Sequence, residues 1–315
     1  MSRILRNSRN INGVLLLDKD LNISSNKVLQ EVKSIYNAKK AGHTGTLDPL
    51  AEGMLPICFG ESTKFAQFLL NAKKRYIVIA RLGQKTSTAD STGKLIKECS
   101  VNFSQIQLDE ALSQFRGNIC QIPSMYSAIK NHGKPLYKYA RQGLEVPRKA
   151  RNITIYHLRC IRYQDNELEL EIDCSKGTYI RTVIDDLGTL LGCGAHVIYL
   201  RRIQVSQYSS DLMVTLKSLQ QIVTLAQEIN IEQSIMLDSL LLPIDAAASH
   251  LPEVNITDIF ATHIIQGKGV QIQAICLPTE GMVRINAGNK RKFIGVGNLD
   301  NQGYLTPYRL VSNIY

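Results

Sequence analysis

The chain has 315 residues, of which 44% are hydrophobic, and a formal net charge of +10. This length and composition indicate a globular protein with room for one large domain and a small one, and they exclude an intrinsically disordered chain. No apolar run approaches the roughly 20 residues that a membrane span needs. The polar, basic start MSRILRNSRN lacks the apolar core of a secretory signal, so we expect a cytoplasmic protein that does not associate with membranes.

The seven cysteines are scattered through the chain and include no Cys-x-x-Cys pair. An odd count without paired spacing argues against both a disulfide framework and a structural zinc site. We therefore interpret the cysteines as buried or idle thiols, and we expect no metal site.

The basic charge is concentrated in the first half of the chain. Residues 1–150 hold 23 Lys and Arg against 11 Asp and Glu, whereas residues 151–315 hold 14 against 16. A one-sided surplus is typical of a protein that binds a polyanion, because each phosphate that is neutralised releases counterions. From the charge alone, a basic surface that serves only solubility is an equally good interpretation.

The first half of the sequence predicts alternating strands and helices. NGVLLLDK (12–19) is typical of a buried strand, and Ser24 and Ser25 offer N-caps for the helix that follows. Ser104 and Gln107 have the spacing of a capping box for a later helix. Between these helices we expect strands at 54–59 and 75–83, and one more helix at 61–70.

Residues 124–151 interrupt this pattern. They hold seven Lys or Arg against one Glu, interleaved with Tyr126, Tyr137 and Tyr139. We expect this basic insertion to leave the core of the protein.

The second half begins with ELELEIDC (167–174), which places apolar residues on one face and acids on the other. Strict alternation is typical of an antiparallel strand with one solvated face. An apolar stripe between Ile180 and Leu191 predicts a helix that packs on that sheet. A strand at 195–205 and helices near 215–226 and 231–241 are expected next.

From about residue 251 the character of the sequence changes. Short apolar runs are broken by frequent glycines, which is typical of a small β-rich unit. We therefore predict a domain boundary that separates residues 1–250 from residues 251–315.

The stretch AGHTGTLDPLAEGML (41–55) concentrates the candidate chemistry. A residue before proline favours extended backbone, so we expect Asp48 to project its carboxylate from a fixed loop. Taken alone, Asp48 is better explained as a residue that initiates a turn through its side chain. His43 could likewise be a structural histidine.

Other candidate residues also have ordinary interpretations. Arg181 has Asp185 at i+4, where a modest surface ion pair would form. Tyr76 and Tyr179 could each be an aromatic residue at the edge of a strand.

Three further chemistries fit the loop poorly. The motif G-x-x-x-x-G-K-[ST] is absent, which argues against nucleotide hydrolysis. His43 and Asp48 have no further ligands at a metal-binding spacing. Hydrolysis of a glycosidic bond normally needs two carboxylates, and the nearest second one, Glu52, lies beyond the proline and could simply face solvent.

Four longer segments carry a family resemblance: GHTGTLDPLAEGMLPICFGESTKF, KRYIVIARLGQKTSTADSTG, CSKGTYIRTVIDDLG and GCGAHVIYLRR. In this order they resemble the TruB-type tRNA pseudouridine-55 synthases. The resemblance implies an α+β fold with a mixed, largely antiparallel central sheet flanked by helices, followed by a small β-rich PUA-like domain. One turn departs from the family pattern, which reads Lys-Pro-x-Gly where this chain has Lys19, Asp20, Leu21 and Asn22.

The resemblance also implies an activity, the conversion of the uridine at position 55 in the T-arm of tRNA to pseudouridine. Asp48 would be the essential nucleophile, and Arg181 would keep it ionised through charge-assisted hydrogen bonds. Tyr76 would complete the catalytic set by stacking under the base after it has flipped out of the RNA. The flipped base and the space that it leaves would be lined by His43, Tyr76, Tyr179 and Leu200. No cofactor is implied.

Weaker contacts to the RNA backbone are expected from six basic residues: Lys64, Lys74, Lys130, Lys134, Lys138 and Arg141. The basic insertion would grip the T-arm through phosphates, and the C-terminal domain would reach the acceptor stem. We expect a monomer. A rival interpretation is a tRNA-binding module or folding chaperone without chemistry, and a hydrolytic glycosylase that releases uracil is a more distant one.

Overall fold

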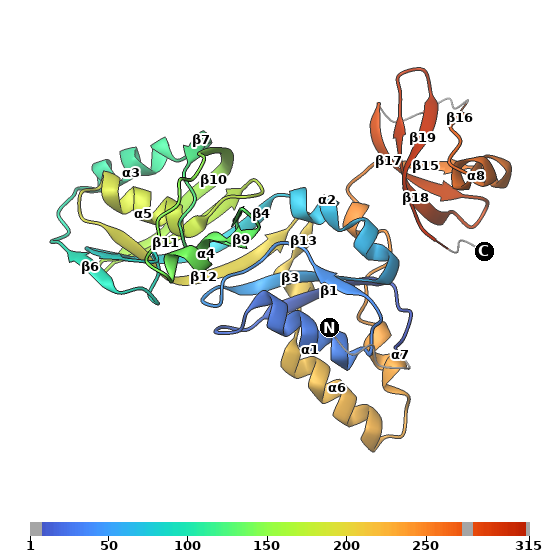
Figure 1. The fold of residues 1–315 in the computed structure, drawn as a ribbon, viewed down its shortest axis with the longest axis horizontal. Helices are drawn as coiled ribbons and strands as arrows, with labels where there is room; N and C mark the ends of the chain where they lie inside the picture. Colours follow the sequence, from blue (N-terminus) through green and yellow to red (C-terminus); the bar gives the residue numbers. More distant parts are fainter. Residues whose placement is uncertain (1–7, 273–279, 313–315) are drawn as a thin grey trace. The chain divides into compact units, whose positions relative to one another are not determined.

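The computed structural model describes residues 8–272 and 280–312, which form two compact units (Figure 1). The first unit takes in residues 8–47, 54–71, 206–272 and 280–312, and the second takes in residues 48–53 and 72–205. The short segment 48–53 therefore belongs to the second unit, although the chain on both sides of it belongs to the first. Cys276 lies outside the described residues.

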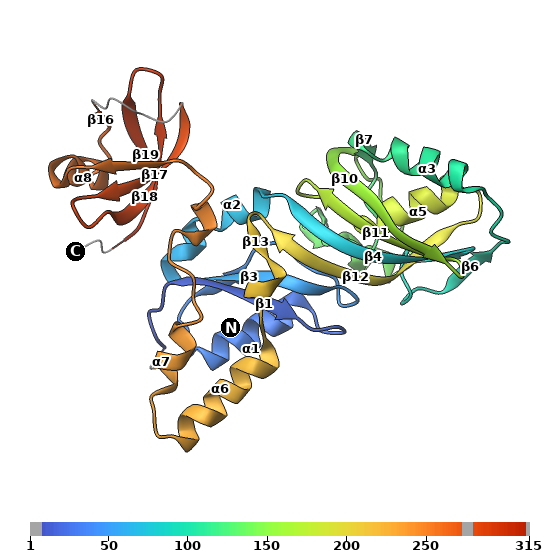
Figure 2. The same ribbon diagram turned by 180° about the vertical axis from the view of Figure 1, so that it is seen from behind.

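In the first unit the buried strand β1 (Gly13–Lys19) is central. It pairs in parallel with β14 (Val214–Thr215) and lies beside β3 (Glu52–Phe59), which also pairs antiparallel with β2 (Ala41–His43). The helices α1 (Ser25–Ile35) and α6 (Leu216–Glu228) lie side by side in both views (Figures 1 and 2). The strand predicted at 12–19 and the helix after it are thus confirmed, with Ser24 as the N-cap.

The first unit also contains short elements. These are η1 (Gly60–Lys64), α2 (Ala66–Asn71), β13 (Tyr208–Ser209), η2 (Ser210–Leu212), α7 (Gln233–Asp238) and η3 (Ala246–Ala248). The single helix predicted at 61–70 is wrong in detail, because the 3-10 helix η1 ends at Lys64 and Phe65 separates it from α2. Phe65 is completely buried, so tertiary packing overrides the helical pattern at this point.

The second unit is built on five antiparallel strands. Their order is β12 (Ala195–Val205), β4 (Lys74–Leu82), β11 (Glu167–Cys174), β10 (Arg151–Gln164) and β7 (Gly117–Gln121). The helix α5 (Ile180–Leu190) packs on β12 and β4, and α3 (Gln105–Gln114) packs on α5 (Figure 1). Glu52 and Gly53 pair in parallel with β12. The sheet is therefore mixed and largely antiparallel with flanking helices, as predicted.

The remaining elements of the second unit are short. They are β5 (Gln84–Thr86), β6 (Leu95–Glu98), β8 (Lys130–Asn131), β9 (Lys134–Pro135) and α4 (Leu136–Ala140). The last three are the regular elements of the basic insertion. The capping box of α3 is confirmed, because the Ser104 and Gln107 side chains bond each other's backbone N–H groups.

The alternation predicted for β11 is confirmed: its four apolar residues are buried and its acids are partly exposed. The acids pair with arginines of the neighbouring strands, among them Arg75 with Asp173 and Arg159 with Glu171. The acids and arginines on this face of the sheet therefore compensate each other. This face does not account for the net positive charge of the protein.

Residues 253–310 contain a separate five-stranded sheet with its own apolar core. Its strands, in order, are β15 (Glu253–Ile256), β17 (Gly281–Ala287), β18 (Lys292–Leu299), β19 (Tyr304–Leu310) and β16 (Val270–Gln271). The segment also holds α8 (Asp258–Ile265), which the sequence did not predict. With only two turns, α8 is too short for a helical repeat to stand out in the sequence.

The atypical turn after β1 is held by other means than proline and glycine. Asn22 has a φ of 63°, in the left-handed region that a glycine would supply, and asparagine is one of the few other residues that visit this region routinely. Lys19 is fully buried, and its ammonium donates to the carbonyls of Asp20 and Ile23, each at 2.8 Å. Lys19 therefore closes the turn from inside.

The helices of residues 8–272 and 280–312 include none that is long and apolar enough to cross a membrane.

Candidate active site

Arg181, in the first turn of α5, is the centre of a polar cluster inside the second unit. Its side chain is only 4% exposed, and the guanidinium lies 2.8 Å from Asp48 Oδ2 through both Nε and an outer nitrogen. The remaining donors bond the carbonyls of Thr88, at 2.9 Å, and Tyr126, at 2.8 Å. A buried guanidinium needs such partners, because an unpaired charge in this position would be costly. The arginine is thus fixed from three directions.

Asp48 is held at one oxygen and open at the other. Both bonds from Arg181 converge on Oδ2, and within the part of the chain that the structure describes no donor binds Oδ1. The side chain is 37% exposed, so solvent or a ligand can reach it. The fixed oxygen orients the carboxylate while the other keeps its lone pairs for chemistry.

The backbone after Asp48 is fixed as well. The amide of Ala51 donates to the carbonyl of Asp48 at 3.1 Å, which closes a turn over Pro49. Gly53 has a φ of 96°, and a Cβ atom there would lie 2.3 Å from the carbonyl oxygen of Arg202. A glycine is therefore required where this loop joins β12.

The ordinary interpretations of Arg181 and Glu52 are wrong in this structure. Arg181 does not pair with Asp185, whose carboxylate instead lies 3.0 Å from the ammonium of Lys85. Glu52 does not simply face solvent, because its Oε1 accepts hydrogen bonds from Tyr199 and Arg201, each at 2.9 Å. Glu52 is thus tied to β12.

Asp90 is a member of the cluster that sequence reasoning missed. It is buried, and its Oδ2 lies 3.6 Å from Arg181 Nε. Its Oδ1 accepts from the hydroxyls of Thr88 and Thr92, each at 2.6 Å, and from the Thr92 amide at 3.0 Å. Arg181 therefore lies between two carboxylates. The signal was the spacing Thr-x-Asp-x-Thr in TSTADST, which is typical of a carboxylate that accepts local hydrogen bonds.

Tyr76, Tyr179 and Leu200 belong to the same unit as Asp48. Tyr76 on β4 and Leu200 on β12 are buried. Burial raises the pKa of Tyr76, with Asp48 acting in the same direction and Arg202 opposing it. Burial likewise raises the pKa of Tyr179, and Asp48 again contributes. Both phenols are therefore neutral at physiological pH and lie within electrostatic reach of Asp48.

Tyr179 is also fixed at its backbone, directly before α5. Its amide donates to the side chain of Gln121 at 2.9 Å, and its carbonyl accepts from the same side chain at 3.0 Å. The guanidinium of Arg151 lies 5.7 Å from the centre of its ring. The half-buried ring of Tyr179 therefore has a fixed position and remains partly accessible.

His43 lies on β2 in the first unit. Its strand pairs with β3 through His43 and Ile57, and the next residue, Thr44, donates its amide to the carbonyl of Pro56. The role assigned to His43 by the family resemblance stays a prediction.

Two of the lysines expected at the RNA backbone have structural partners. Lys74 is only 6% exposed and donates to the carbonyl of Ala72, which does not fit the expectation of a surface phosphate contact. Burial lowers the pKa of Lys74 to about 8, and the positive charge of Arg202 acts in the same direction. Lys64 bonds Glu61, the carbonyl of Leu310 and the hydroxyl of Ser312.

The basic side chains of the insertion are held only loosely. Lys134 donates to Gln142 and lies 4.5 Å above the ring of Tyr139, and Arg141 lies 5.4 Å from the ring of Tyr137. Lys130 and Lys138 carry no ion pair with a described residue. These cations remain available to an anionic partner.

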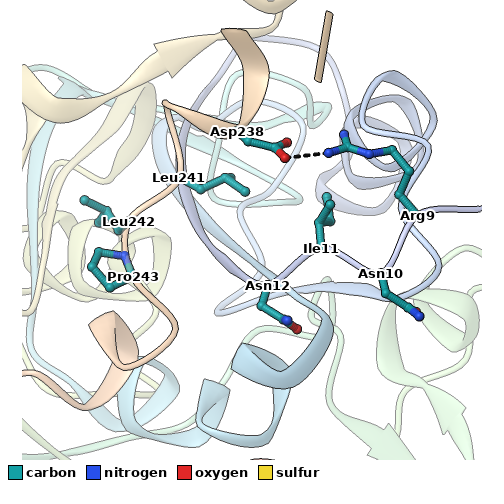
Figure 3. A pocket seen from close by; sticks show the side chains of 8 residues that line it. All are labelled: Arg9, Asn10, Ile11, Asn12, Asp238, Leu241, Leu242 and Pro243. Carbon is teal, nitrogen blue, oxygen red and sulfur yellow. Dashed lines mark hydrogen bonds and ion pairs between the residues drawn. The ribbon is translucent and has the colours of Figure 1, made fainter. Parts of the chain in front are cut away.

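Two other features of the protein offer no competing site. Within residues 8–272 and 280–312 no group of three or more His, Cys, Asp or Glu side chains could hold a metal ion. Figure 3 shows a pocket of about 570 Å³ in the first unit, across which Arg9 pairs with Asp238. The other lining residues are uncharged, so this pocket offers no candidate nucleophile.

Comparison with known families gives three matches along the chain. The model of the TruB family pseudouridylate synthase N-terminal domain matches residues 33–180. The model of the tRNA pseudouridylate synthase B C-terminal domain matches residues 181–249. The model described as pseudouridine synthase II TruB, C-terminal, matches residues 252–311.

Curated relatives match nearly the whole chain. The chain is 58% identical over 306 residues to a tRNA pseudouridine synthase B from Photorhabdus laumondii, with 97% of each chain covered. It is also 58% identical over 311 residues to a protein of the same name from Serratia proteamaculans, covering 99% of this chain and 98% of the relative.

Solved structures share the fold at lower identity. A protein in a Cbf5-Nop10-Gar1 complex is 26% identical with a TM-score of 0.71, covering 92% of this chain and 79% of that one. A chain in an H/ACA RNP bound to a substrate RNA containing 2'-deoxyuridine is 24% identical with a TM-score of 0.72, covering 95% and 84%. The second likeness supports the fold alone.

Proposed function

The chain belongs to the TruB family of pseudouridylate synthases, and from this premise we propose that it converts a uridine of tRNA to pseudouridine, with position 55 in the T-arm as its target. The observation that carries the proposal is the Asp48 carboxylate, fixed by Arg181 at one oxygen and open at the other. An exposed turn-former would not need a buried guanidinium that is itself bonded to two carbonyls.

The proposed chemistry needs an ionised, oriented carboxylate. Displacement of water by a bound RNA would by itself disfavour the charged form of the carboxylate. The guanidinium of Arg181 counteracts this through charge-assisted hydrogen bonds to Oδ2. Oδ1 then remains to attack the flipped nucleotide.

The base must leave the RNA stack before Asp48 can reach it, which costs a few kcal/mol. Tyr76 recovers part of this cost by stacking under the flipped base, a contact worth about 1–3 kcal/mol. Tyr179 and Leu200 enclose the uracil, and His43 braces the space that the base leaves. The raised pKa values of Tyr76 and Tyr179 keep both rings uncharged beside the carboxylate.

The reaction is an isomerisation. The bond between uracil N1 and ribose C1′ breaks, the uracil turns within its pocket, and C5 bonds to C1′. A proton leaves C5 and N1 takes one up, and the bond that Asp48 Oδ1 forms with the nucleotide is broken again as the exchange is completed. No atom is gained or lost overall, so the reaction calls for no cofactor and no second catalytic carboxylate. The arrangement agrees with this, because Glu52 and Asp90 are both engaged by neighbouring side chains.

The RNA is proposed to be held by shape and charge. The lysines of the basic insertion, Lys130, Lys134 and Lys138, together with Arg141, contact phosphates of the T-arm. The C-terminal residues 251–315 reach the acceptor stem as a separate RNA-binding domain, and the enzyme acts in the cytoplasm as a monomer.

The test is the variant Asp48→Asn, which keeps the shape of the side chain and removes its charge. We expect it to bind a T-arm transcript like the wild type and to lose release of tritium from C5-labelled uridine entirely. Asp165→Asn, an exposed acid in the β10–β11 turn, is the matched control and should react normally. Tritium release by Asp48→Asn at the wild-type rate would refute the proposal, and release of free uracil by the wild type would indicate a glycosylase.

A further inference from the structure

The peptide group before Asp48 is held by a buried serine, Ser25. The hydroxyl of Ser25 accepts a hydrogen bond from the amide of Leu47 and donates one to the carbonyl of Leu47, each at 2.8 Å. Both residues are buried. Because residues 46–48 belong to no helix or strand, this one side chain supplies both hydrogen bonds that regular structure would otherwise give to the backbone of Leu47.

The contact with Ser25 determines how the chain enters Asp48. The carbonyl of Leu47 belongs to the same planar peptide unit as the amide and the Cα atom of Asp48, so a bond to this oxygen orients the whole unit. After Asp48, the amide of Ala51 donates to the Asp48 carbonyl at 3.1 Å, and Pro49 restricts the Asp48 backbone. The backbone of Asp48 is therefore held on both sides.

Ser25 is available for this contact because its neighbour caps the helix. The sequence offers both Ser24 and Ser25 as N-caps. In the structure Ser24 is the N-cap of α1, and its hydroxyl accepts from the amide of Lys27 at 3.2 Å. Ser25 is the first residue of α1 and bonds Leu47, 22 residues away in the sequence. The two adjacent serines thus have different tasks.

The element that carries Ser25 is well anchored. The helix α1 buries Val28, Leu29 and Val32. The turn before it is closed from inside by the ammonium of Lys19, which donates to the carbonyl of Ile23 at 2.8 Å. A hydroxyl on such an element fixes its partner more precisely than one on a loop would.

We propose that Ser25 is a positioning residue for the reaction, which holds the peptide group between Leu47 and Asp48 so that Asp48 presents its carboxylate in the productive direction. This inference rests on the proposed nucleophilic role of Asp48. A displacement of about 1 Å can lower a rate by about 100-fold, and Ser25 acts on the backbone that carries the reacting group. Since Ser25 is only 2% exposed, it acts through Asp48 and not on the RNA.

The test is Ser25→Ala in the full-length protein, which removes the hydroxyl that both polar groups of Leu47 use. We expect the single-turnover rate at saturating RNA to fall by about 10-fold to 100-fold, while the affinity for a T-arm transcript stays that of the wild type. Ser25→Cys keeps nearly the same size but forms only weak hydrogen bonds. Its rate should lie between those of Ser25→Ala and the wild type, and it keeps the test decisive if the alanine variant fails to fold.

The matched control is Ser62→Ala. Ser62 is also a buried serine of the first unit, and its hydroxyl likewise accepts from a backbone amide, that of Gly13, and donates to a carbonyl, that of Ile244, each at 3.1 Å. Its loss should lower the Tm as much as the loss of Ser25 does and leave the rate unchanged. An equal loss of rate in Ser62→Ala would mean that general loss of structure slows the reaction, and it would overturn the proposal.

The remaining outcomes separate the role of Ser25 from the proposed function. A wild type that releases no tritium from C5-labelled uridine would refute the proposed function, and the role of Ser25 with it. A wild type that reacts, beside Ser25→Ala and Ser25→Cys variants that react equally fast, would refute the role of Ser25 alone. A loss of RNA affinity in Ser25→Ala without a loss of rate would also contradict a positioning role.

Discussion

The arginine cluster and the basic insertion use positive charge in opposite ways. Arg181 is buried, bonds two carbonyls and the Asp48 carboxylate, and has a second carboxylate, Asp90, at 3.6 Å. In the insertion, residues 124–151, the cations are largely solvated and contact mainly tyrosine rings and a glutamine. The arginine cluster holds a single charge in place with partners in several directions. The basic insertion leaves several charges that are not held in place.

The difference follows from what each charge has to do. A catalytic group must be in place before the substrate arrives, because reorganising it during the reaction would add to the barrier. A phosphate contact has no such requirement, since its free energy comes largely from counterion release. Preorganisation is thus expected to govern rate in the cluster and charge alone to govern affinity in the insertion.

The largest effect is expected from Arg181→Lys, which keeps the charge but not the planar fork. One ammonium cannot bond Asp48 and the carbonyls of Thr88 and Tyr126 in the present geometry. We expect the single-turnover rate to fall by about 100-fold or more, as when an oriented donor is removed from an active site. A rate within a few fold of the wild type would show that charge, and not orientation, is what Asp48 needs.

A large effect on stability is expected at Lys74, a buried cation close to another cation, Arg202. Its pKa is about 8 against an ordinary 10.5, so between these pH values the unfolded chain binds more protons than the folded one. Stability should therefore rise with pH across this window, by about 3 kcal/mol at most, and the full penalty applies below pH 8.

Lys74→Met removes this titration. The variant should be more stable than the wild type at pH 7, and its advantage should shrink as the pH rises towards 10. Denaturant unfolding of both proteins at several pH values gives the difference directly. A constant difference would mean that Lys74 titrates normally.

A smaller effect is expected from Asp90→Asn, which keeps the local hydrogen bonds to Thr88 and Thr92 but removes one of the two charges beside Arg181. The guanidinium would be free to shift towards Asp48, and we expect a loss of about 10-fold in rate with unchanged RNA affinity. Asp165→Asn again serves as the control. An equal loss of affinity would assign Asp90 to RNA binding.

The smallest effect on the reaction is expected from replacing Lys130, Lys134 and Lys138 by alanine together. The slope of log affinity against log salt should flatten by about 2, near 0.7 for each phosphate that the variant no longer neutralises, and the rate at saturating RNA should not change. Lys94, Lys97 and Lys217, which are exposed, form the control set. An unchanged slope would remove the insertion from the interface.

Much of this protein could be predicted without coordinates. The strands β1 and β11 and the helices α1 and α3 follow from local patterns: apolar runs, strict alternation and capping side chains. The break at Phe65 and the short helix α8 did not follow, because packing in the folded chain decides them. The left-handed Asn22 shows the same limit, since the turn persists although its expected proline and glycine are missing.

The sequence by itself determined which residue types were present, the asymmetry of charge and the family, because these depend on identity and order along the chain. Only the tertiary structure decided which partner each charge takes. Arg181 has Asp185 four residues away in the sequence, yet it pairs with Asp48, 133 residues distant. It also lies near Asp90, which the sequence did not predict. The physical reason is that burial forces a charge to find every available partner, and burial is a property of the fold and not of neighbours in sequence.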